Sequence, residues 1–110
     1  MRNSAWNKYE VAILIEGYIR FANSNASRND VAKEISNRLR SGVYHDSITY
    51  RNINGITLQL GAIEYLMTDG EHGISHVSNL FREIVELYKE DCCAFQKLLE
   101  EANKTYPKIC

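Results

Sequence analysis

Few residues in this sequence have the type and spacing that catalysis or metal binding requires. His72 and His76 lie four residues apart, with the carboxylates of Asp69 and Glu71 close by, which is the weak outline of a metal site. Gly73 between the two histidines favours a solvated loop instead, and neither a CxxC nor an HExxH motif occurs. We therefore expect no metal site and no cofactor.

The cysteines form neither a catalytic nor a disulfide pattern. Cys92 and Cys93 are adjacent and Cys110 is the third, an odd set that makes a poor disulfide framework. Free thiols indicate a reducing compartment, so we expect a cytoplasmic protein. Carboxylates at Glu90 and Asp91 disfavour the thiolate that a nucleophile needs, and we expect one cysteine of the pair to pack in the core. Because GxSxG and phosphate-loop motifs are also missing, the sequence predicts a protein that is not an enzyme.

Residues suited to binding nucleic acid gather between Arg28 and Gln59. Positive side chains can contact phosphates, and the candidates are Arg28, Lys33, Arg38, Arg40 and Arg51, with His45 beside them. Amides and hydroxyls can pair with base edges, and the candidates are Asn52, Asn54, Thr57 and Gln59. A helix that begins near Tyr50 can also donate backbone N–H groups to a phosphate. Together these residues predict a surface for duplex DNA.

Ordinary structural roles explain several of the same residues equally well. Arg51 and Asn52 can cap their own helix, while Thr57 and Gln59 can be plain surface. Residues 1–60 carry eight Lys or Arg and five Asp or Glu, a net +3, whereas residues 61–110 carry five and nine, a net −4. A basic half can meet an anionic partner, but two oppositely charged halves can also attract each other within one fold.

Hydrophobic periodicity predicts that five helices and no strand position these residues. We expect an all-α bundle that forms one domain over residues 1–110, with no run apolar enough to cross a bilayer. The expected helices span about 7–22, 28–41, 49–67, 78–89 and 91–103. The first three make a helix-turn-helix-like N-terminal part, about 7–67, and the last two make a C-terminal pair, about 78–103.

Cap residues and apolar faces add detail to these helices. The expected N-caps are Asn7 (with Glu10 as a capping box), Ser27, and either Ser75 or Ser78. The helix over 49–67 has two apolar faces, one through Ile53, Ile56, Leu60, Ile63 and Met67 and the other through Leu58, Ala62 and Tyr65. A helix that is apolar on two sides is usually central to its domain, so we expect this helix at the centre.

Two stretches resemble known families. The opening WNKYE at residues 6–10, followed by Leu14, looks like the start of Myb/SANT-like three-helix DNA-binding domains. The segments ISNRLR at 35–40 and YRNINGITLQL at 50–60 are similar to a pattern in N-terminal domains of bacterial HNH-type and modification-dependent restriction endonucleases and related defence proteins. That resemblance implies DNA engagement or assembly beside a nuclease or helicase. An HNH motif is missing from this sequence, so it implies no nuclease activity here.

The sequence therefore supports two functional hypotheses. The first is a non-catalytic DNA-binding module of a restriction or defence system, with helix 49–67 as the recognition element and the preceding helix and linker on the phosphates. The second is a protein-interaction or regulatory module, which dimerises, docks on a nuclease, or inhibits a nucleic-acid enzyme as a phage-encoded protein would. The acidic second half and the second apolar face of helix 49–67 favour the second hypothesis.

Overall fold

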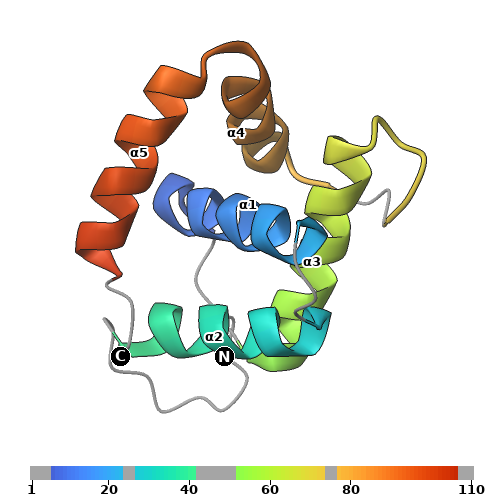
Figure 1. Ribbon diagram of the computed structural model, residues 1–110, viewed down its shortest axis with the longest axis vertical. Helices are drawn as coiled ribbons and strands as arrows, with labels where there is room; N and C mark the ends of the chain where they lie inside the picture. Colours follow the sequence, from blue (N-terminus) through green and yellow to red (C-terminus); the bar gives the residue numbers. More distant parts are fainter. Residues whose placement is uncertain (1–5, 24–26, 42–51, 74–76, 107–110) are drawn as a thin grey trace.

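The computed structural model describes residues 6–23, 27–41, 52–73 and 77–106, and these residues form an all-α bundle (Figure 1). Its helices are α1 (Lys8–Ala22), α2 (Arg28–Ser41), α3 (Ile53–Met67), α4 (Asn79–Glu90) and α5 (Cys92–Thr105). The fold class predicted from hydrophobic periodicity is confirmed. Within the described ranges no strand occurs, and no helix is long and apolar enough to cross a membrane.

Local capping signals define where most helices begin. The side-chain oxygen of Asn7 accepts the N–H of Glu10 at 2.9 Å, and the Glu10 carboxylate accepts the N–H of Asn7 at 3.1 Å, which is the predicted capping box. The hydroxyls of Ser27 and Ser78 each accept the backbone N–H three residues on. These contacts satisfy N–H groups that have no partner within the helix.

Helix α3 begins later than the sequence predicted. Its first residue is Ile53, because Asn52 adopts an extended conformation and its side chain accepts the N–H of Gly55 at 2.8 Å. The expected start near residue 49 is therefore wrong. The linker expected from Val43 to Ser47, together with Tyr50 and Arg51, lies outside the described residues.

Helix α1 occupies the centre of the bundle and packs against all four other helices. Figure 1 shows α1 in the middle, with α2 below it, α4 above it, and α5 and α3 on either side. Every residue from Glu10 to Ile15 is buried, so this part of α1 is covered all the way round. The predicted central position of α3 is wrong, because α1 takes that place and the second apolar face of α3 is partly open at Leu58.

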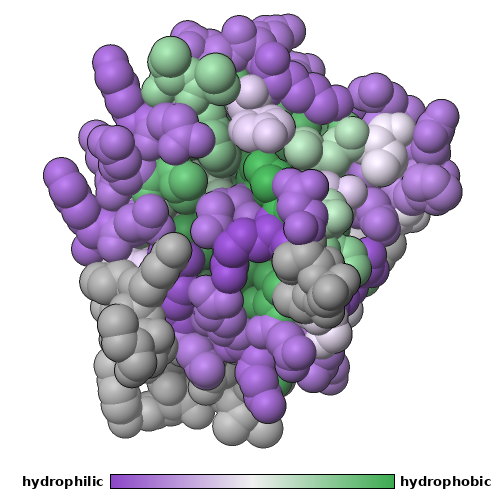
Figure 2. Space-filling model, viewed as in Figure 1, coloured by the Kyte–Doolittle hydropathy of each residue, from purple (hydrophilic) through white to green (hydrophobic). Residues whose placement is uncertain are grey.

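The surface follows the usual division between polar exterior and apolar seams. Figure 2 shows hydrophilic side chains over the outer sides of the helices, with apolar residues visible in the seams between them.

The turn after α3 carries positive φ angles at Asp69, Gly70 and Gly73. Gly73 lies so close to α3 that an added Cβ would be 2.4 Å from the carbonyl oxygen of Gly61. This turn therefore packs directly on the α3 backbone.

Candidate functional site

The residues considered for catalysis or metal binding are not brought together. Across the described ranges, no group of three or more His, Cys, Asp or Glu side chains is placed to hold a metal ion. His72 is exposed, and His76 lies outside those ranges. Cys92 and Cys93 are both exposed, so the expected packing of one of them in the core is wrong. The physical reason is that Asp91 caps α5 and both cysteines fall in its solvent-facing first turn.

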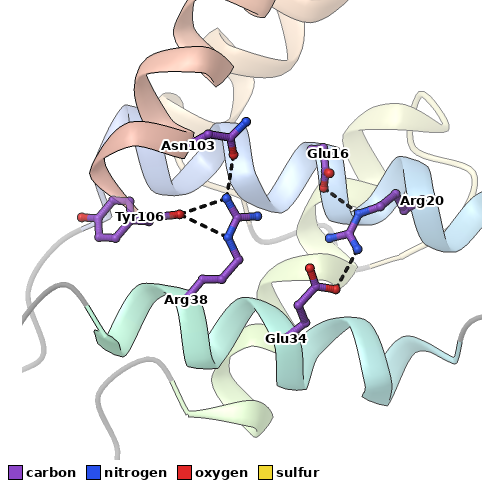
Figure 3. A network of polar contacts seen from close by, with 6 residues as sticks. All are labelled: Glu16, Arg20, Glu34, Arg38, Asn103 and Tyr106. Atoms are coloured by element: carbon purple, nitrogen blue, oxygen red, sulfur yellow. Dashed lines mark hydrogen bonds and ion pairs between the residues drawn. The ribbon is translucent and has the colours of Figure 1, made fainter. Parts of the chain in front are cut away.

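Arg38, a predicted phosphate contact, points into the protein. Its side chain is 1 % exposed, and its guanidinium donates to the carbonyl of Tyr106 at 3.0 and 3.2 Å and to Asn103 at 2.6 Å (Figure 3). Burial lowers the pKa of Arg38, and the carboxylates of Glu16 and Glu34 oppose that shift. A cation at the C-terminal end of α5 also suits the helix dipole. Arg38 thus joins α2 to the end of α5, and its guanidinium is not on an exposed surface.

Arg28, another predicted phosphate contact, is partly engaged by neighbouring helices. Its guanidinium donates to Glu64 of α3 at 3.1 Å and lies 5.5 Å from the ring centre of Phe21. Burial and the nearby Glu64 carboxylate raise the pKa of Tyr18, while Arg28 lowers it. The charge of Arg28 is therefore paired within the fold.

A second arginine joins α1 to α2 between two carboxylates. Arg20 donates to Glu16 at 2.8 Å and to Glu34 at 2.7 Å (Figure 3). Burial works against the charge of Arg20, but the hydrogen bonds to Glu34 and Glu16 outweigh it and raise the pKa of Arg20. The charges of Arg20, Glu16 and Glu34 between α1 and α2 are therefore paired with one another.

The remaining candidates for binding nucleic acid fall into three groups: exposed residues, residues that hydrogen-bond within their own helix, and residues outside the described ranges. Lys33 and Asn54 are exposed, and Gln59 is half-buried. Asn52 caps α3, and the hydroxyl of Thr57 donates to the carbonyl of its own helix four residues back. The Arg40 side chain, His45, Tyr50 and Arg51 lie outside the described part. Helix α3 contains no Lys or Arg, so as a recognition element it brings no cation of its own.

Sequence reasoning missed one exposed stripe. Asn29 and Asn37 lie four residues before and after Lys33 on α2, and all three side chains are exposed. Residues four apart on a helix share a face, so the three form a polar edge with one positive charge. Their four-residue spacing is the signal in the sequence that identifies this edge.

An apolar groove lies between α3 and the start of α4. It encloses about 550 Å³ and is lined by Trp6, Leu58, Gln59, Ala62, Val77, Ser78, Asn79 and Phe81. Leu58 is 54 % exposed, and no other large apolar side chain among the described residues is as exposed. The ring of Trp6 meets Phe81 edge-on, with ring centres 6.0 Å apart. The second apolar face predicted for α3 thus forms one wall of this groove, and none of the described residues that line it is charged.

Comparison with known proteins gives no relative. No family model, curated protein or solved structure matches the chain. The resemblance to Myb/SANT-like domains and to restriction-endonuclease N-terminal domains stays a prediction.

Proposed function

We propose that this chain is a protein-interaction module that binds an apolar segment of a partner protein in the groove between α3 and α4. The observation that carries the proposal is Leu58, which is 54 % exposed at the edge of a hollow walled by Trp6 and Phe81. Fully burying a leucine side chain contributes roughly 1.5–3 kcal/mol, so covering the open half of Leu58 contributes about 1 kcal/mol. Trp6 beside it is only partly buried and supplies the kind of aromatic anchor found at the centre of protein interfaces, while Phe81, 2 % exposed, supports the Trp6 ring from the core.

The polar residues of the groove suit the same class of partner. Gln59 and Asn79 have side-chain amides that can both donate and accept hydrogen bonds. Such neutral groups can pair with the backbone or polar side chains of a bound segment. A phosphate backbone, in contrast, needs cations, and the described residues of the lining include none. The lining therefore favours a protein partner over a nucleic acid.

The single tryptophan of the chain allows a direct test, because Trp6 lines the groove. Peptides selected from a random display library on the folded protein are titrated while Trp6 fluorescence is followed. We expect an emission change on binding and at least a roughly tenfold weaker affinity for Leu58→Asp, equivalent to about 1.4 kcal/mol. Gln96→Asp is the matched control, since Gln96 is exposed on α5 and should leave affinity unchanged. Selected peptides that bind both variants equally, without a Trp6 response, contradict the proposal.

Duplex DNA is the second candidate, and a different observation favours it. The exposed edge formed by Asn29, Lys33 and Asn37 on α2, together with the exposed Asn54 at the start of α3, offers amides and one cation. Binding of a labelled duplex at low salt, followed by anisotropy, should weaken in Lys33→Glu and fall steeply as salt rises. Lys97→Glu carries the same charge change on α5 and serves as the control. Equal binding by the two variants removes the α2 edge from the site.

A further inference from the structure

Helices α4 and α5 are separated by a single residue, Asp91, at the short connection where the two helices meet in Figure 1. The backbone N–H of Asp91 donates to the carbonyl of Leu87 at 2.9 Å, and its carbonyl accepts the N–H of Phe95 at 3.1 Å. Its side chain accepts the N–H of Ala94 at 3.1 Å and so caps α5. The helical pattern of hydrogen bonds is therefore interrupted only at residues 92–94.

The sequence through this bend is compatible with one continuous helix. Residues 79–105 contain no glycine and no proline, the two residues that most disfavour a helix interior. Buried or half-buried side chains also recur every seven positions through the bend, at Phe81, Tyr88, Phe95 and Ala102. A seven-residue repeat follows one face of a straight helix. The apolar pattern of α4 thus continues into α5 in register, as if no break were present.

Tertiary packing, and not local sequence, therefore imposes the bend. The buried side chains of α5 are Phe95, Leu98 and Ala102, and this helix packs on α1 and α4. A straight helix over residues 79–105 would be about 40 Å long at 1.5 Å per residue, and it would carry α5 away from α1. Straightening also gives the backbone N–H groups of Cys92 and Cys93, which have no acceptor among the described residues, the carbonyls four positions back. Only the loss of the α1 contact opposes it.

We infer that a second copy of this chain replaces that contact, in a domain-swapped dimer where α4 and α5 form one helix and residues 92–106 of each copy pack on α1 of the other. The exchanged segment re-forms the same contacts, including those of Arg38 with Asn103 and Tyr106, so the two forms differ mainly at Asp91. Residues 90–93 are all exposed, which leaves the hinge free to straighten. The inference is independent of the groove at Leu58, and the dimer would carry two such grooves.

Refolding of the full chain from urea at low and high protein concentration tests the inference, with light scattering to measure mass and a thiol reductant to exclude disulfide dimers. We expect a dimer whose fraction rises with the refolding concentration and which persists on dilution, because exchange requires α5 to leave α1. Asp91→Ala removes the cap of the bent form at two hinges per dimer, so the dimer dissociation constant should fall at least about tenfold. Cys92→Pro should abolish the dimer, because proline suits the first position of α5 but breaks a continuous helix.

Matched variants separate a swapped dimer from other kinds of dimer. Circular dichroism first shows that each variant is folded, and Cys92→Ala, which removes the same exposed thiol, should dimerise as the unchanged chain does. If the unchanged chain and Asp91→Ala are monomers at every concentration, or if Asp91→Ala and Cys92→Pro give equal dimer fractions, the swap is refuted. If Leu58→Asp abolishes a dimer that Cys92→Pro retains, the copies meet through the groove; the swap is then refuted and the groove stands as a binding surface.

Discussion

Replacing Arg38 by alanine tests the buried position of this side chain, which the sequence predicted to lie on the DNA-binding surface. The substitution removes a guanidinium that donates two hydrogen bonds to the carbonyl of Tyr106 and one to Asn103, among its contacts. A hydrogen bond to a charged group contributes about 1.5–3 kcal/mol, and the two that share one carbonyl count as one. Removing the buried charge recovers part of that loss, because burial penalises the ionised guanidinium. We expect the free energy of unfolding to fall by about 3 kcal/mol.

Urea and thermal denaturation measure this loss. For a chain of 110 residues, an unfolding entropy of about 2.1 cal/mol/K per residue converts 1 kcal/mol to about 4 °C, so the melting temperature should fall by roughly 13 °C. Lys33→Ala is the matched control, since Lys33 is exposed on the same helix and should change stability by less than about 0.5 kcal/mol. A loss below about 1 kcal/mol for Arg38→Ala would falsify the buried position of Arg38 and return it to the candidate DNA surface.

Three further predictions concern other parts of the fold. Gly73→Ala should lower the free energy of unfolding, measured in urea, by more than about 2 kcal/mol, because an added Cβ meets the α3 backbone at a residue with positive φ. Gly70→Ala also has a positive φ, but its Cβ contacts are no closer than 3.4 Å, so the loss should be about 1 kcal/mol. Equal losses would contradict the packing of this turn. Ser78→Ala should lower stability by about 1 kcal/mol through loss of the α4 cap, and no change in urea midpoint would argue against that cap. Cys92 and Cys93 should both react with a thiol reagent in the native protein when the third cysteine is replaced by serine; protection of either one would contradict their exposure.

Features encoded locally could be predicted from the sequence. The helices, the capping box at Asn7 and the caps at Ser27 and Ser78 depend on residues within one turn of each other, and all are present. The residue type of Asn52 fits both a cap and a base-reading residue, and the structure shows that its side chain accepts the N–H of Gly55, three residues on. Local sequence patterns were therefore sufficient to predict the helices and their caps, but they left the role of an individual polar residue such as Asn52 ambiguous.

Features that depend on distant partners could not be predicted. Arg38 follows Val31 by seven residues, so it falls on the buried face of α2, and that spacing was a usable signal. Its acceptors lie on α5 and just beyond it, 65 and 68 positions further along the chain, and no pattern within α2 identifies them. The groove likewise depends on how α4 meets α3, so the second apolar face of α3 indicated a contact surface without indicating its shape.

The central position of α1 has a consequence for how the chain acquires its structure. During synthesis α1 emerges well before α5, yet the two helices pack against each other. The buried segment from Glu10 to Ile15 therefore stays incompletely covered until α5 has been made. Such long-range closure slows folding and leaves nascent chains open to chaperones and proteases. A fragment that ends after α3 would expose this segment permanently, so we expect it to aggregate rather than to behave as an independent three-helix domain.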